Sequence, residues 1–363
     1  MFLKNVSQLS PTSLKNRYLL LSCVDFDLKK IKCYLYQLKE ERYMRPYIGV
    51  TGFTDRNQVE TALSEFLGAD SVGEHMLMVG ILVSHKTLRG ETNKFPARYP
   101  AISTISDLLV SSSQVLNLVH FNTHTQNFCE ELEIVAQHAG PNLDGFQLNL
   151  CWPDPTEIYA YKNKHHPSTI VLQIGGRAFA QIGLDPSKLT DVLERNYGDL
   201  IDYILLDPSG GTGQQMNIHK TNEYLDEIYS KGLQNKFGIG IAGGLSSENI
   251  SILQPLVDKY DNLSIDAEGR LRIPENDLMN LSEVQRFIQA SKDLLIKPTN
   301  SMVLCDGCNV KAPHEHRCHG SGPITVHGDR KEMACECIPC NNPPSAEKLQ
   351  EWADAGYPED FVF

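Results

Sequence analysis

The chain has 363 residues, of which 41% are hydrophobic and 21% are charged, and its formal net charge is −12 at pH 7. This length can bury the core of one large domain and still leave residues for an appendage. The acidic balance argues against a protein that coats nucleic acid, because such a protein needs a basic surface to displace counterions. No apolar run reaches the roughly 20 residues of a membrane span, and no segment typical of a signal peptide opens the chain. These features predict a soluble, cytoplasmic protein with no membrane partner.

Residues 1–45 predict a separate N-terminal extension, because they fit poorly into the repeating pattern that follows. Tyr18–Val24 has the apolar pattern of a strand, and Leu28–Glu40 has that of a helix. We expect this extension either to plug the base of the main domain or to form an oligomer contact. The sequence leaves the oligomeric state open.

Residues 46–297 alternate short apolar runs with amphipathic stretches. The strand candidates are Tyr47–Thr51, Met76–Val83, Asn117–Phe121, Gly145–Leu150, Thr169–Ile174, Ile201–Leu206, Phe237–Ala242 and Leu263–Ile265. The helix candidates are Arg56–Leu67 with Asp55 as its N-cap, Ile102–Leu109, Asn127–His138, Thr156–Lys162, Ser187–Asn196, Thr221–Lys231, Ser247–Asp258 and Leu281–Leu294. Eight such units over about 250 residues predict an α/β fold of the closed (β/α)8, or TIM-barrel, type. A doubly wound open sheet is the competing fold, which the missing Gly-x-Gly-x-x-Gly turn disfavours.

The active site of such a barrel is built at the C-terminal ends of its strands. Asp207 ends the apolar sixth strand and is expected to point into the barrel mouth, where desolvation can raise its pKa for acid–base work. An N-cap or loop-ordering role is the alternative for this aspartate. Glycine clusters follow the sixth and seventh strands, at Gly210, Gly211, Gly213, Gly243 and Gly244. Glycine lets backbone N–H groups approach an anion, so the clusters predict phosphate binding, although tight turns alone also explain them.

Several motifs follow one another in the order found in a known enzyme family. The first strand carries Gly49-Val50-Thr51-Gly52-Phe53-Thr54, the sixth carries Leu205-Leu206-Asp207 before Gly210-Gly211-Thr212-Gly213, and the seventh carries Ala242-Gly243-Gly244-Leu245 with Asn249 nearby. Arg98-Tyr99 follows the second strand, Asn122 the third, and Gln147-Leu148 lies in the fourth. Over residues 46–295 the chain resembles phosphoribosylanthranilate isomerase, a (β/α)8 enzyme of tryptophan synthesis.

This resemblance implies an isomerase that acts on a phosphorylated, ribose-type small molecule through an Amadori rearrangement. It implies that Asp207 is the general acid. It also implies substrate contacts from Arg98, Asn122, Gln147, Gly210, Gly211, Gly213, Gly243 and Gly244.

Three positions depart from the family pattern. Thr51 stands where the family has its general base, a cysteine, and a threonine hydroxyl is hardly ionised near neutral pH. Gly49 replaces a lysine, and the family's phosphate-holding Ser-Gly is replaced around Asp266 and Glu268, whose charges repel phosphate. We therefore expect a changed, phosphorylated ribose or nucleotide-like substrate, with Thr51 orienting it at the catalytic position. Asp266 or Glu268 then serves as a new base or as a ligand of ribose hydroxyl groups, and a solvated turn is the alternative.

The cysteines predict a further module at residues 301–363. Six of the ten cysteines lie between residues 305 and 340, beyond a Lys297–Asn300 linker that contains proline. Cys-x-x-Cys pairs suit a metal held by thiolates, and such sites without an open position are structural. We expect one or two structural zinc ions, held by Cys305, Cys308, Cys318, His319, Cys335, Cys337 and Cys340.

Two other functions remain open. A barrel that carries Cys-x-Cys-x-x-Cys and Gly243-Gly244-Leu245-Ser246 also resembles tRNA-guanine transglycosylases, which implies base exchange on a nucleic acid. The net charge disfavours that partner. The other possibility is a non-catalytic barrel that only binds a ligand.

Overall fold

The computed structural model describes residues 44–68, 73–125, 127–207 and 216–296, together with four two-residue strands. These strands are β9 (Val303–Leu304), β10 (Lys311–Ala312), β11 (Pro323–Ile324) and β12 (Met333–Ala334), paired as β9 with β10 and β11 with β12. Several predictions lie outside the described residues: the elements at 18–24 and 28–40, the linker at 297–300, the glycines Gly210, Gly211 and Gly213, and all seven zinc ligands.

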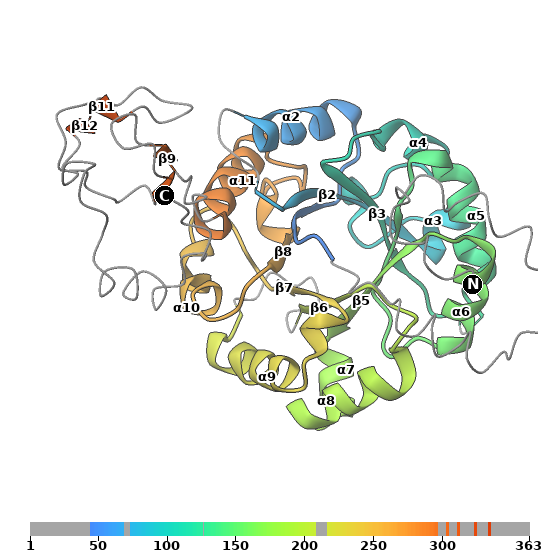
Figure 1. The fold of residues 1–363 in the computed structure, drawn as a ribbon. Helices are drawn as coiled ribbons and strands as arrows, with labels where there is room; N and C mark the ends of the chain where they lie inside the picture. The colour runs from blue at the N-terminus through green and yellow to red at the C-terminus, as the bar shows by residue number, and fades with distance from the viewer. Residues whose placement is uncertain are drawn as a thin grey trace, which may run out of the picture.

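Eight parallel strands close into a barrel, shown in Figure 1. They are β1 (Tyr47–Thr51), β2 (Met76–Ser84), β3 (Val115–Asn122), β4 (Gly145–Leu148), β5 (Thr169–Gly175), β6 (Tyr203–Asp207), β7 (Gly238–Ala242) and β8 (Leu263–Ala267). β8 pairs with β1 through Ile48 opposite Ile265 and Gly49 opposite Asp266, which closes the ring. The predicted TIM-barrel fold is confirmed, and the open-sheet alternative is wrong.

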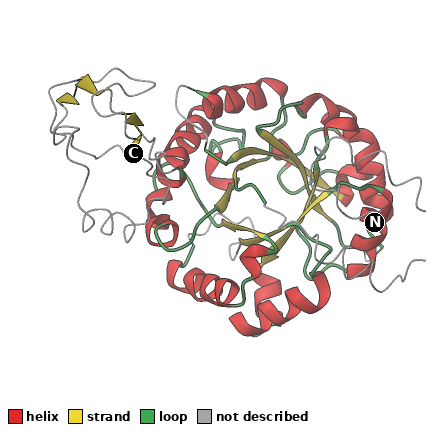
Figure 2. Ribbon diagram, in the orientation of Figure 1, coloured by secondary structure: helices red, strands yellow, loops and turns green. Residues whose placement is uncertain are grey.

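Helices surround the barrel and cover its outer face (Figure 2). They are α2 (Arg56–Leu67), α3 (His85–Leu88), α4 (Ile105–Leu108), α5 (Cys129–Ala139), α6 (Pro155–Lys164), α7 (Gly176–Gln181), α8 (Pro186–Val192), α9 (Ile218–Ser230), α10 (Gln254–Val257) and α11 (Leu281–Leu295). The predicted cap of α2 is present, because the backbone N–H of Asn57 donates to Asp55 Oδ1 at 2.8 Å. None of the helices in the described part of the chain is long and apolar enough to cross a membrane.

The helix predicted at Ser247–Asp258 is broken in the structure. A 3-10 turn spans Ile250–Leu253, and α10 contributes only four residues after it. Pro255 lies in the first turn of α10 and has no N–H to donate, so an α-helix cannot run through it from Ser247. The helix predicted at Ile102–Leu109 is likewise divided into a 3-10 turn and the short α4.

The barrel interior is apolar at its base. Alternate residues of each strand point inward, and the apolar ones form one buried cluster: Tyr47, Met78, Leu116, Leu118, Val171, Tyr203, Leu205 and Ala242. The Tyr203 hydroxyl donates to the carbonyl of Arg45 at 2.7 Å, which fixes its ring across the base. On β3, β5 and β6 the next inward residues are the buried polar His120, Gln173 and Asp207, so on these strands the interior changes from apolar to polar toward the C-terminal ends.

Gly238 is required by the packing of this base. A Cβ at this position would lie 2.2 Å from Cδ1 of Tyr203 and 2.3 Å from Cε1. We expect Gly238→Ala to lower the free energy of unfolding by about 1–3 kcal/mol, as overpacking in a core does. Gly175→Ala is the matched control, because its Cβ meets nothing within 4 Å, and urea denaturation followed by circular dichroism compares the two. Equal stability of the two variants contradicts this packing argument.

Candidate active site

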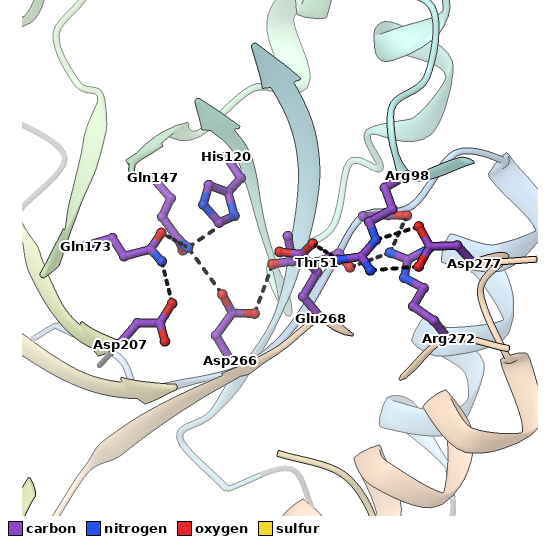
Figure 3. Close-up of polar contacts among 11 residues, drawn as sticks. Thr51, Arg98, His120, Gln147, Gln173, Asp207, Asp266, Glu268, Arg272 and Asp277 are labelled. Atoms are coloured by element: carbon purple, nitrogen blue, oxygen red, sulfur yellow. Dashed lines mark hydrogen bonds and ion pairs between the residues drawn. The ribbon is translucent and has the colours of Figure 1, made fainter. Parts of the chain in front are cut away.

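A buried carboxyl group, Asp266, lies at the centre of the polar end of the barrel (Figure 3). Its Oδ1 accepts a hydrogen bond from the Thr51 hydroxyl at 2.9 Å, and its Oδ2 accepts one from Gln147 Nε2 at 3.2 Å. Burial raises the pKa of Asp266 to about 7, although these two hydrogen bonds favour the ionised form and oppose the rise. The negative charges of Glu268 and Asp207 raise the pKa further. Asp266 can therefore both accept and donate a proton near neutral pH.

Two carboxamides connect Asp266 to the second buried aspartate, Asp207. Gln147 on β4 also lies within hydrogen-bond distance of Gln173 on β5, with Nε2 and Oε1 3.4 Å apart. Gln173 Nε2 then donates to Asp207 Oδ2 at 2.7 Å. All four side chains are at least nine-tenths buried. The structure thus brings the predicted residues Asp207, Gln147 and Asp266 into one network, and Gln173 is the link that the sequence analysis missed.

His120 on β3 borders the same network. Its Nδ1 lies 3.4 Å from Gln147 Nε2, and its buried Nε2 has no hydrogen-bond partner in the described structure. Burial lowers the pKa of His120, which favours the neutral imidazole. A neutral ring can donate one hydrogen bond and accept another. His120 is therefore a further polar group available to a ligand at this end of the barrel.

Thr51 donates a hydrogen bond directly to Asp266. Its side chain is fully buried, and its hydroxyl hydrogen is directed to the Asp266 carboxylate. Gly80 on the neighbouring strand leaves room for this contact, since a Cβ there would lie 2.5 Å from Thr51 Oγ1. Thr51 is at the predicted strand end, and the structure shows that it orients a carboxylate from β8.

Removing the Thr51 hydroxyl is expected to raise the pKa of Asp266 above about 7. Thr51→Val keeps the side-chain shape but deletes a hydrogen bond that stabilises the ionised carboxylate. A hydrogen bond to a charged group contributes about 1.5–3 kcal/mol, which corresponds to a rise of about one to two units in that pKa. Carbon-13 NMR titration of the aspartate carboxyls measures it, with Thr61→Val on α2 as the control. An unchanged titration means that Thr51 does not stabilise the carboxylate.

Arg98 holds two acidic side chains at the rim. Its Nη2 and Nε bind the Asp277 carboxylate at 2.6 and 2.8 Å, and its Nη1 binds Glu268 Oε1 at 2.8 Å. The predicted substrate contact at Arg98 is thus a guanidinium whose charge is already shared by two carboxylates. Because Glu268 is paired here, the negative charges expected near a phosphate are partly neutralised by the chain itself.

Arg272, which the sequence analysis missed, joins the ends of β8 and β1. Its Nη2 donates to the carbonyls of Thr51 and Gly52, both at 2.9 Å. Burial lowers its pKa to about 10. Gly52 has a φ of +95°, and a Cβ there would lie 1.9 Å from Arg272 Nη2, so only glycine fits beside this guanidinium. No motif in the sequence marks Arg272, because its partners are backbone atoms.

Of the glycines for which phosphate binding is predicted, Gly243 and Gly244 lie within the described residues, directly after β7. Gly243 and Gly244 have φ values of +135° and +60°, which side chains rarely adopt. The Asn249 side chain donates to the Gly244 carbonyl at 2.7 Å and accepts from the N–H of Ser246 at 2.8 Å. The backbone N–H of Ser247 donates to Glu283 Oε1 at 2.8 Å. The N–H groups of Ser246 and Ser247 at the start of the following turn are therefore bound by protein groups.

A cavity of about 480 Å³ opens beside the network, over the ends of β3, β4 and β5. Its lining includes Asn122, Asn149, Cys151, Trp152, Gln173 and Arg177. The predicted substrate residue Asn122 thus lies in this cavity, and Gln173 belongs to both the cavity and the carboxylate network. A ligand in the cavity is therefore adjacent to Asp207.

Comparison with known proteins adds no family assignment. No protein-family model matches the chain, and no curated protein matches it in sequence. Within the described residues no group of three or more His, Cys, Asp or Glu side chains could hold a metal ion. The resemblance to phosphoribosylanthranilate isomerase therefore rests on the motifs quoted above, and the fold with which it agrees is shared by many activities.

Proposed function

We propose that the chain is an isomerase-type enzyme that moves a proton on a phosphorylated ribose or nucleotide-like small molecule, with Asp266 and Asp207 as its acid–base pair. The observation that carries the proposal is Asp266: a buried carboxyl with a pKa of about 7, connected through Gln147 and Gln173 to a second buried carboxyl. A group whose pKa lies near the working pH is suited to general acid–base catalysis.

The two carboxyl groups have complementary roles in this proposal. Asp207 gives a proton to the ring oxygen of the sugar, which opens the ring and leaves a double bond between C1 and its substituent nitrogen. The Asp266 carboxylate then removes the proton from C2, and the electron pair moves toward C1 and the nitrogen. This replaces the thiolate of the family pattern by a carboxylate, which Thr51 orients. The isomerisation consumes no oxidant or reductant.

The phosphate of the substrate is assigned to the β7 corner. Gly243 and Gly244 carry no side chain that would block an anion from their backbone N–H groups, and Gly243 is buried at the end of β7. No hydrogen bond within the described residues uses the N–H of Gly243 or Gly244. Unused N–H groups in such a turn form an anion-binding concavity.

Solvent deuterium labelling tests the proposed function and requires no identified substrate. The protein is incubated in D2O with a small-molecule extract of the cells that express it, and mass spectrometry detects compounds that gain a carbon-bound deuterium. We expect at least one phosphorylated compound to be labelled by the native protein and not by Asp207→Asn. If the native protein and Asp207→Asn give identical spectra, the acid–base proposal is wrong and the ligand-binding alternative is favoured.

We further propose that the C-terminal cysteines bind structural zinc. The support is the spacing alone, with Cys305 and Cys308 in one Cys-x-x-Cys pair and Cys337 and Cys340 in another. Native mass spectrometry of the full chain is expected to show one or two zinc ions that a chelator removes. A chain that carries no metal under these conditions contradicts this assignment.

A further inference from the structure

The cavity over β3, β4 and β5 lies across the barrel from the glycines of β7. In the ring of eight strands, β3 and β7 are four strands apart, which places them on opposite sides of the mouth (Figure 1). The cavity also shares Gln173 with the network that ends at Asp207. A substrate with phosphate at Gly243 and its sugar above the carboxylates can extend its remaining part into this cavity. Its volume of about 480 Å³ is within the range of about 300–1,000 Å³ usual for small-molecule pockets.

Trp152 lines the cavity and is held in place by its neighbours. Its backbone has a φ of +49°, an unfavourable conformation for a bulky residue that costs about 1–3 kcal/mol and is typical of functional sites. The indole stacks on Tyr197, with ring centroids 6.1 Å apart and planes inclined by 26°. The Tyr197 hydroxyl donates to the carbonyl of Pro153 at 2.7 Å, which holds the strained segment in place. An aromatic wall fixed in this way is preorganised to contact a planar ring.

Three polar side chains of the cavity are available to a ligand. Arg177 is exposed, and its charge acts on the thiol of Cys151 in the same lining, but it forms no hydrogen bond or ion pair with any residue that the structure describes. The side-chain amides of Asn122 and Asn149 are likewise unbonded there. The carboxylate in the lining, Asp154, is engaged at the start of α6, where its Oδ1 accepts from the N–H and the hydroxyl of Thr156, both at 2.8 Å. The cavity therefore presents a donor-only guanidinium beside two amides that can donate and accept.

We infer that this cavity binds a planar heteroaromatic ring, with Trp152 contacting its face and Arg177 donating to a carbonyl and a ring nitrogen on its edge. A guanidinium matches two adjacent acceptors on such a ring in bidentate fashion, whereas a ring edge that carries an amino donor leaves part of the guanidinium unpaired. The inference rests on the proposed function only in placing the phosphate at Gly243 and hence the rest of the substrate toward this cavity. It assigns Trp152 and Arg177 as specificity-determining residues of the substrate site.

Tryptophan fluorescence tests the inference. The chain contains two tryptophans, Trp152 and Trp352, so one substitution leaves Trp152 alone. In the Trp352→Phe background Trp152 is the only indole, and the probes are inosine 5′-monophosphate, inosine and adenosine 5′-monophosphate. Inosine carries the carbonyl and the adjacent ring nitrogen that Arg177 requires, whereas adenosine keeps the ring nitrogen but has an amino group in place of the carbonyl. We expect saturable quenching by both inosine compounds, with tighter binding of inosine monophosphate than of adenosine monophosphate.

Arg177→Gln is expected to weaken binding of inosine and of inosine monophosphate by about 10- to 100-fold each, as for the loss of a charge-assisted pair. Adenosine monophosphate should change little, and Arg195→Gln on the exposed outer surface is the control for the loss of one positive charge. The absence of quenching by the inosine compounds at about 10 mM overturns the inference. Weakening confined to the two phosphorylated probes also overturns it, because Arg177 then binds phosphate. Quenching in a protein that labels no compound in D2O contradicts the proposed function and leaves the ring site intact.

Discussion

Asp266→Asn is expected to lower the rate of solvent deuterium labelling by about 10²- to 10⁴-fold, which is the usual contribution of a general acid or base. The carboxamide neither accepts nor releases a proton as an acid or base near neutral pH, yet it retains the size of the carboxyl. It can also keep its contacts, because the Gln147 Oε1 atom has no hydrogen-bond partner among the described residues. Rotation of the Gln147 amide would let that oxygen accept from the new amide, so the variant is expected to fold.

Asp266→Asn is also expected to change how the free energy of unfolding depends on pH, and this effect can be measured without a substrate. Burial raises the pKa of Asp266 from 3.8 to about 7, so the folded state keeps this proton up to a higher pH than the unfolded state. Between about pH 4 and pH 7 unfolding therefore releases a proton, and stability falls as the pH rises. Above pH 7 the penalty is complete and amounts to about 4 kcal/mol at most. Asp266→Asn removes the penalty and should flatten this part of the stability profile.

Urea denaturation between pH 4 and pH 8 measures this effect. We expect the native chain to lose stability relative to Asp266→Asn as the pH rises through this range, with the largest difference near pH 8. Asp261→Asn, on the exposed loop before β8, is the control for the loss of a carboxylate. Parallel profiles for the native chain and Asp266→Asn would show that the carboxyl titrates normally, and the acid–base proposal would then lose its main support.

Arg98→Ala is expected to lower the free energy of unfolding by about 2–4 kcal/mol. The guanidinium is paired with Glu268 and Asp277, and the exposed side-chain fractions of the three are 10%, 18% and 29%. Removing the cation leaves two carboxylates in a poorly hydrated position without a partner, and such a loss destabilises far more than the loss of an exposed ion pair. The partial exposure of both carboxylates keeps the expected effect below that of a fully buried pair.

Arg195→Ala is the matched control for this prediction. Its ion pair with Asp191 is 3.4 Å long and lies on the surface of the barrel, with 77% and 46% of the two side chains exposed. Such a pair contributes about 0.5 kcal/mol or less. Thermal or urea denaturation compares the two variants, and a second variant, Arg98→Lys, shows whether charge alone suffices. Equal stability of Arg98→Ala and Arg195→Ala would mean that the contacts of Arg98 with Glu268 and Asp277 do not stabilise the fold.

Much of the site could be predicted from the positions of polar residues at strand ends. Asp207 was found because it closes an apolar run, whereas Gln147 and Thr51 were found through the family resemblance. His120 and Gln173 carry the same signal, since each follows an inward apolar residue, Leu118 or Val171, by two positions. The period of two in a strand places them in the same interior row, and a strict reading of this period would have included both.

The sequence by itself determined an α/β fold of eight parallel strands, because apolar runs that recur with amphipathic stretches between them can bury both of their faces only as parallel strands covered by helices. It also determined which strand ends carry polar groups. Only the tertiary structure decided that Thr51 donates to Asp266, that Arg98 is shared by Glu268 and Asp277, and that Arg272 binds carbonyls at the end of β1. These partners are 170 or more residues apart in the chain. Their contact follows from the closure of β8 onto β1, and the burial that shifts the pKa of Asp266 exists only after that closure.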